Sequence, residues 1–233
     1  ARNLAGFPFV GRSTRRQRAE VLQRIHKEIV SDRMDWQVLW VSMLDCDDLD
    51  RQLLMERHLV SKNHAEADRD HPRAVAIGQD ETFSIMINEE DHLRMQALRS
   101  GMQLGAAFEA ITQIDDQLES HLDYAFSSRW GYLTACPTNV GTGIRVSVML
   151  HLPALKLTGE IEKVRRAARE MHLAVRGLFG EGSEAMGDLY QVSNQTTLGK
   201  SEQELLDEFE HKVVPEIIAY EQQARQALIR HRS

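Results

Sequence analysis

The chain has 233 residues, of which 42% are hydrophobic and 27% are charged, and its formal net charge is −7. This length suits one large domain or two small ones, and the composition supports a buried core. The acidic balance argues against a general binder of nucleic acids or membrane surfaces, and no apolar run approaches the roughly 20 residues that span a bilayer. We therefore expect a globular protein with no direct nucleic-acid partner and no membrane partner.

The two cysteines, Cys46 and Cys136, lie in unrelated surroundings. There is no CxxC pair and no HExxH motif, so no structural or catalytic metal ligands are predicted. The pattern favours two free thiols in a reducing cytoplasm, which is the location we expect.

The first half of the chain alternates helices with short strands. It is predicted to contain a loop over residues 1–12, a helix over 13–32 that Ser13 and Thr14 can cap, a strand over 36–44, a helix over 47–58 and a loop over 61–73. A hairpin of residues 74–77 and 83–87, an alternating strand over 92–98 and a helix over 102–122 follow.

The second half is predicted to contain strands over residues 130–135, 144–152, 173–176 and 189–192, a helix over 155–171 and a long final helix capped by Ser201. The order lacks strict βαβ alternation. We therefore predict an α+β fold with a largely antiparallel sheet that helices flank and cover on one side.

The segment Cys136–Arg145, CPTNVGTGIR, combines a thiol, two glycines, small polar residues and an arginine between two predicted strands. Glycine lets backbone N–H groups approach a ligand, and arginine can grip phosphate with its planar fork. Similar mixtures occur in NEEDHLR (Asn88–Arg94), in RGLFGE (Arg176–Glu181) and around His58. No Walker motif and no HRD or DFG set is present, which excludes P-loop and protein-kinase sites of the usual kind.

Three of these motifs, NEEDHLR, CPTNVGTGIR and RGxxxE in this order along the chain, resemble those of the ATP:guanidino phosphotransferases, the family of arginine and creatine kinases. The tracts VSVMLHLPAL (Val146–Leu155), GEGSEA (Gly180–Ala185) and VSNQTTLGKSE (Val192–Glu202), with the opening ARNLAGFPF (Ala1–Phe9), are similar to its bacterial protein-arginine kinase branch. The resemblance covers essentially the whole chain. It implies one guanidino kinase catalytic domain over residues 1–233, of the glutamine-synthetase-like fold.

The resemblance implies that the γ-phosphoryl group of ATP moves to a guanidinium nitrogen, with Mg²⁺ held mainly by the nucleotide. It assigns catalysis to Glu90, Cys136 and Glu181. It assigns ATP binding to His58, Arg94, Arg145, Val146, Ser147, Val148, Met149, Arg176, Gly177, Leu178, Phe179, Gly180 and Glu181.

Some neighbouring residues leave alternatives open. Glu184 competes with Glu181 for the acidic role, and Glu89 and Asp91 are expected only to orient their neighbours. The other histidines, His64 among them, carry no predicted role.

The branch implies a protein-arginine kinase that marks proteins for a Clp-type protease. Its partners would be proteins with exposed arginine and an activator protein, and by analogy a second copy in a homodimer. Two alternatives are a kinase for free arginine or another small guanidino compound, and a non-catalytic phosphoarginine- or nucleotide-binding adaptor. Family members carry a further arginine segment upstream of Ala1, and the branch carries a C-terminal phosphoarginine-binding region, neither of which is present in this sequence.

Overall fold

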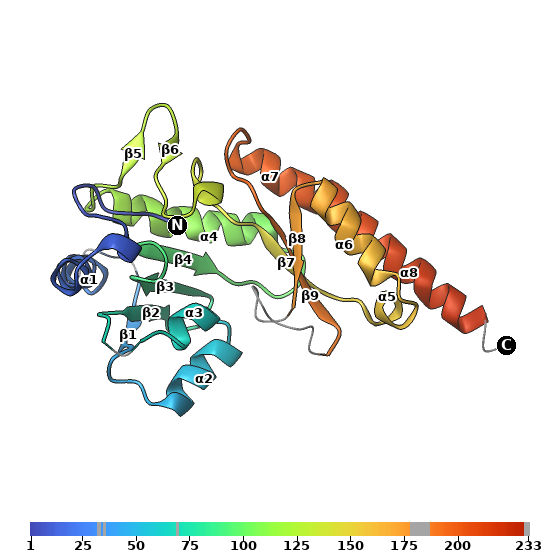
Figure 1. Ribbon diagram of the computed structural model, residues 1–233, viewed down its shortest axis with the longest axis horizontal. Helices are drawn as coiled ribbons and strands as arrows, with labels where there is room; N and C mark the ends of the chain where they lie inside the picture. Colours follow the sequence, from blue (N-terminus) through green and yellow to red (C-terminus); the bar gives the residue numbers. More distant parts are fainter. Residues whose placement is uncertain (32–33, 35, 69, 178–186, 231–233) are drawn as a thin grey trace. The chain divides into compact units, whose positions relative to one another are not determined.

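A computed structural model describes residues 1–31, 34, 36–68, 70–177 and 187–230. The chain divides into two compact units, Ala1–Gly143 and Ile144–Ser233 (Figure 1). That residues 1–233 form one catalytic domain stays a prediction, since such a domain can contain both units.

The first unit is built on a four-stranded antiparallel sheet in the order β1-β2-β3-β4. Its strands are β1 (Val38–Ser42), β2 (Ala74–Gly78), β3 (Phe83–Ile87) and β4 (Leu93–Ala97). The register pairs Ala76 with Ile85, which confirms the predicted hairpin. The strands are rich in β-branched and other apolar residues, as expected for a sheet buried in a core.

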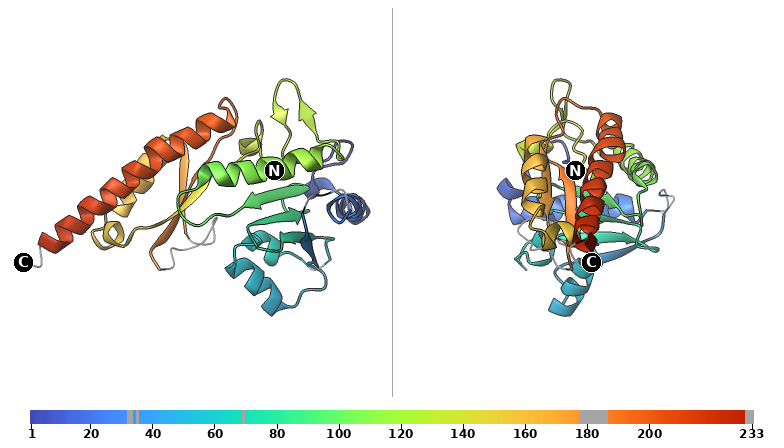
Figure 2. Two further views of the ribbon diagram at one scale, coloured as in Figure 1. Left: turned by 180° about the vertical axis from the view of Figure 1, so that it is seen from behind. Right: turned by 90° about the vertical axis from the view of Figure 1, so that its right-hand side faces the viewer.

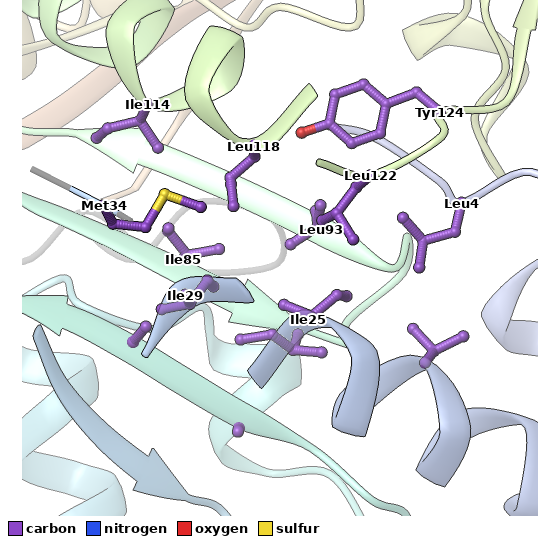
Figure 3. Packing of buried hydrophobic residues seen from close by; sticks show 14 residues of the cluster. Leu4, Ile25, Ile29, Met34, Ile85, Leu93, Ile114, Leu118, Leu122 and Tyr124 are labelled. Carbon is purple, nitrogen blue, oxygen red and sulfur yellow. The ribbon is translucent and has the colours of Figure 1, made fainter. Parts of the chain in front are cut away.

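Side chains alternate between the two faces of this sheet, and each face has its own core. On one face, Ala76 and Ile85 pack among side chains of α1 (Arg15–Ile29) and α4 (Leu104–Glu119), as Figure 3 shows for the buried cluster. On the other face, Val75 and Met86 pack with residues around α2 (Asp48–Glu56) and α3 (Lys62–Ala65). The expectation of a sheet covered on one side is therefore wrong for this unit, because both faces are apolar.

Polar side chains cap three helices of this unit, α1, α2 and α3. Thr14 forms a capping box with Gln17 at the start of α1, and Asp47 accepts the N–H of Asp50 at the start of α2. Ser61 caps α3 in the same way, by accepting from His64 N–H. The sequence predicted only loop over residues 61–73, since a helix of four residues has too short a pattern to detect.

A short hairpin of β5 (Phe126–Ser127) and β6 (Gly131–Tyr132) follows α4, and the 3₁₀ turn η2 (Pro137–Asn139) lies beyond it. Another 3₁₀ turn, η1 (Val10–Arg12), precedes α1. The strand predicted over residues 130–135 is observed only as Gly131–Tyr132. After β6, two backbone groups form hydrogen bonds with side chains instead of with a neighbouring strand. Asn3 donates to the Leu133 carbonyl, and Asp91 accepts the Ala135 N–H.

The second unit contains an antiparallel sheet in the order β7-β9-β8. Its elements are β7 (Ser147–His151), α5 (Pro153–Leu157), α6 (Ile161–Glu170), β8 (Leu173–Arg176), β9 (Leu189–Asn194), α7 (Glu202–Glu208), the π-helical η3 (Phe209–Val213) and α8 (Val214–Arg230). Figure 2 shows the long helix ending in α8 alongside this sheet. The single helix predicted over residues 155–171 is wrong: Gly159, with φ of 72°, separates α5 from α6.

Within the described part of the chain, no helix is both long enough and apolar enough to cross a membrane.

Candidate functional site

The turn between β3 and β4 carries three consecutive acids, and they occupy different environments. Asn88 opens the turn at a φ of 58°, and its N–H donates to the His92 carbonyl. Glu89 and Asp91 are buried, whereas Glu90 between them is exposed. The fold therefore presents one carboxylate of the three to solvent.

Glu89 joins three segments through its carboxylate. Oε1 accepts from Ser61 Oγ at 2.7 Å and from Arg94 Nη1 at 3.2 Å, and Oε2 accepts from the Glu90 N–H at 2.8 Å. The Glu89 side chain is 4% exposed and that of Arg94 is 42% exposed. Glu89 thus orients Arg94 and the backbone of Glu90, in agreement with the expectation that it orients its neighbours.

Residues 136–141, which we call the Cys136 loop, are joined to this turn by a hydrogen bond from the residue before them. The Ala135 N–H, directly before Cys136, donates to Asp91 Oδ1 at 2.7 Å. Cys136 is half-buried, and its Sγ lies 3.0 Å from Thr138 Oγ1. Arg94 and the Glu90 N–H thus bond to Glu89, and the residue before Cys136 bonds to Asp91, so the two buried acids link the three predicted site segments.

His58 follows α2 with a φ of 57°. Its carbonyl accepts from Gln96 Nε2 at 2.5 Å, and Gln96 lies two residues after Arg94, on the same face of β4. Burial lowers the pKa of the His58 imidazole. The predicted nucleotide-contacting histidine is thus tied to the strand that carries Arg94.

The second unit carries the remaining predicted ATP-binding residues that the structure describes. Met149, Gln191 and Arg176 are paired across the three strands and share one face of the sheet, and Arg176 Nη1 donates to Ser193 Oγ at 3.0 Å. The opposite face carries Tyr190, over whose ring lies the Arg165 guanidinium of α6.

The other predicted ATP-binding residues of the second unit lie directly before β7 and within it. Val146 is buried and pairs through its N–H with Asn194 Oδ1 at 2.8 Å, while Ser147 is exposed and lies on the Met149 face. Arg145 precedes this segment and Val148 lies on the opposite face, and Gly177 ends the described part of the β8 region.

Leu178, Phe179, Gly180, Glu181 and Glu184 lie outside the described residues. Their predicted roles in catalysis and ATP binding stay predictions.

Two residues near the site were missed by the sequence reasoning. Ser61 reaches Glu89, and the only sequence signal was a serine ahead of a very short helix. His64, expected to be incidental, is fully buried, with Nε2 at 3.1 Å from the Ala74 carbonyl. Burial lowers its pKa to about 4, against an opposing charge effect from Glu89.

Acidification should weaken the first unit in two stages. Because the folded state keeps His64 neutral, its contribution is complete above its ordinary pKa of 6.5 and is lost as the pH falls toward about 4. Burial by itself would raise the pKa of Glu89, but Arg94, Ser61 and the Glu90 N–H together lower it below its ordinary 4.5. The Glu89 contribution is therefore complete above pH 4.5 and is lost at lower pH.

Urea unfolding at stepped pH values, followed by tryptophan fluorescence, measures both stages, since Trp36, Trp40 and Trp130 all lie in the first unit. The upper stage should cost up to about 3 kcal/mol of unfolding free energy. His64→Gln should reduce the upper stage, to which His58 and His92 also contribute because burial lowers the pKa of each imidazole, and Glu89→Gln should reduce the lower one. Identical pH profiles for the wild type and both variants would contradict this account.

Solved structures with this fold include guanidino kinases. The duplicated taurocyamine kinase of Schistosoma mansoni, with bound transition-state-analogue components, matches 95% of this chain and 32% of its own at 26% identity and a TM-score of 0.83. A lombricine kinase matches 97% of this chain and 65% of its own at 28% identity and a TM-score of 0.79. Together with the antiparallel sheets and flanking helices, these matches confirm the predicted α+β guanidino kinase fold.

Curated relatives match over nearly the whole chain. The protein-arginine kinase of Halothermothrix orenii is 46% identical over 100% of this chain and 65% of its own length. That of Shouchella clausii is 43% identical over 99% of this chain and 64% of its own length. The chain thus spans slightly less than two thirds of these relatives.

The sequence-family model described as the C-terminal catalytic domain of ATP:guanido phosphotransferases matches residues 20–224 of this chain. This range includes all three motifs. This match and the protein-arginine kinase relatives confirm the family predicted from those motifs. The chain belongs to the ATP:guanido phosphotransferase family.

Proposed function

We propose that the full-length protein transfers the γ-phosphoryl group of ATP to arginine side chains of proteins. The observation that carries this proposal is the exposed Glu90 between two buried acids, of which Glu89 bonds to Arg94 and Asp91 bonds to the backbone before Cys136. The relatives named protein-arginine kinase, which match along nearly the whole chain, support protein as the acceptor.

The chemistry explains why a carboxylate and a thiol belong near one acceptor. A guanidinium is a delocalised cation and a poor nucleophile. As a guanidinium nitrogen forms a bond to the γ-phosphorus, the bond between that phosphorus and the oxygen bridging it to the β-phosphorus breaks. ADP leaves with this oxygen, and the guanidinium gives up a proton. Glu90 would hold the cation in line and accept that proton, Cys136 would contact the guanidinium through its thiol, and Glu181 is proposed as a second carboxylate.

The phosphates need positive charge around them. Arg94, Arg145 and Arg176 are proposed to supply it. His58 is proposed to contact the nucleotide, as are Val146, Ser147, Val148, Met149, Gly177, Leu178, Phe179 and Gly180.

Magnesium fits this arrangement as a companion of the nucleotide. In the described residues no group of three His, Cys, Asp or Glu side chains could hold a metal, and Glu89 and Asp91 already accept hydrogen bonds. Mg²⁺ commonly binds through nucleotide phosphates and water, where it neutralises developing charge.

The acceptor is tested by incubating the full-length protein with Mg-ATP and either free arginine or an unfolded, arginine-rich protein. We expect acid-labile phosphate on the protein and none on a matched protein in which lysine replaces every arginine, because lysine lacks the planar fork. Phosphate appearing only on free arginine would favour a small-guanidino kinase, the class to which the structural resemblance to taurocyamine and lombricine kinases points.

We further infer a cytoplasmic location, which the two free thiols support. An activator protein, Clp-type protease components and a second copy of the chain remain proposed partners, on the family resemblance.

A further inference from the structure

We propose that Asp91 is a positioning residue that holds the Cys136 loop at a fixed place relative to Glu90. This inference deepens the proposed function and rests on it. Asp91 directly follows Glu90 in the chain, and Ala135 directly precedes Cys136. A link between Asp91 and Ala135 is therefore a link between the two groups assigned to the acceptor.

One carboxylate oxygen makes that link. Asp91 Oδ1 accepts from the Ala135 N–H at 2.7 Å and from Asn3 Nδ2 at 2.6 Å. Asp91 is 2% exposed. A hydrogen bond to an ionised acceptor is about twice as strong as a neutral one, and burial strengthens it further.

Asn3 reinforces the link from the other side. Its Nδ2 also donates to the Leu133 carbonyl at 3.0 Å, and its Oδ1 accepts the His92 N–H at 2.9 Å. The single amide of Asn3 thus bonds to His92, directly before β4, and to Leu133, directly after β6. Asp91 and Asn3 together form what we call the loop clamp.

The clamp acts at the root of the loop, and local bonds carry its effect onward. Thr134 Oγ1 donates to the Cys136 carbonyl at 2.8 Å, which fixes the backbone of Cys136 itself. Asp91 is buried behind this backbone, so its role is to place the thiol rather than to meet the substrate. A misplacement of about 1 Å at such a site can cost on the order of 100-fold in rate.

Two substitutions of Asp91 separate positioning from charge. Asp91→Ala removes the acceptor, and we expect kcat to fall by about 30- to 100-fold, with the KM for ATP changed less than about twofold. Asp91→Asn keeps an acceptor oxygen without the charge, and we expect it to restore kcat to within about fivefold of the wild type. Equal loss in both variants, with exchange at the Ala135 amide unchanged in both, would overturn the clamp, because it would show that Asp91 acts through its charge alone.

Amide hydrogen exchange and thiol alkylation measure the clamp without using activity. In Asp91→Ala, exchange at the Ala135 amide should rise at least about tenfold, while exchange in β2 and β3 stays unchanged. Alkylation of Cys136 should accelerate relative to that of the buried Cys46. Ile25→Val, a core change in α1 remote from the loop, controls for general loss of stability and should leave both readouts unchanged.

Asn3→Ala tests the same clamp if Asp91→Ala does not fold. It should raise Ala135 exchange by about threefold and lower kcat by a similar factor, because Asp91 keeps one of its two donors. Unchanged exchange, or raised exchange with unchanged kcat, would overturn the proposal. If the wild type transfers no phosphate, the proposed function fails, and the exchange data alone decide whether the clamp exists.

Discussion

Glu90→Gln should lower the turnover of phosphotransfer by about 10²- to 10⁴-fold while leaving the fold intact. Glutamine has nearly the same shape as glutamate but cannot carry the negative charge that holds a guanidinium or accept its proton at neutral pH. Since Glu90 is exposed at the tip of its turn, the substitution leaves the buried bonds of Glu89 and Asp91 in place. Initial rates with Mg-ATP and an arginine-rich protein measure the effect.

Two further variants make this result specific. Glu109→Gln changes an exposed glutamate on α4 and should retain wild-type turnover. Cys136→Ser should lower turnover by about tenfold, because it removes the thiol but keeps a small polar group. Equal activity of Glu90→Gln and the wild type would reject the role given to Glu90, and no activity in any of the proteins would favour the non-catalytic adaptor.

Gly131→Ala should destabilise the first unit by about 2–4 kcal/mol and lower phosphotransfer with it. Gly131 has a φ of 76°, and a Cβ there would lie 2.6 Å from the Gly141 carbonyl oxygen. That oxygen accepts the Tyr132 N–H at 2.9 Å, while the Gly141 N–H donates to the Tyr132 carbonyl at 3.2 Å. The new methyl group would therefore break the bridge that anchors the far end of the Cys136 loop.

Gly105→Ala provides the matched control. Gly105 lies in the first turn of α4, and a Cβ at that position meets no atom within 4 Å. Alanine should therefore stabilise the helix by up to about 1 kcal/mol. Urea unfolding followed by tryptophan fluorescence compares the two variants, and similar midpoints would show that the Gly131 contact is not a constraint.

Elements with long or alternating patterns were predictable from the sequence. The hairpin of β2 and β3 and the stripe of α1 followed from periodicity, and the motif segments around Glu90 and Cys136 were found as candidates. Short elements were not predictable: α3 has four residues and β5 has two, too few for a pattern to emerge. The pattern does not indicate the break at Gly159, because the apolar stripe continues on both sides of it.

The frame around the candidate site could not have been predicted from spacing. Asn3 and Asp91 are separated by 88 positions in the sequence, and Asp91 and Ala135 by 44. Nothing local in the sequence shows which acid of a Glu-Glu-Asp run turns inward, since each is compatible with a solvated turn. The partners that decide the matter come from distant segments.

The burial of Glu89 and Asp91 also affects how the β3–β4 turn could bind a metal ion. Three adjacent acids on a turn could otherwise gather hard oxygen ligands around a divalent cation. Here Glu89 accepts from a hydroxyl, a guanidinium and a backbone N–H, and Asp91 accepts from an amide and a backbone N–H. Glu90 is therefore the one acid of this turn that faces solvent. A single carboxylate suits a monovalent organic cation better than a bare metal ion.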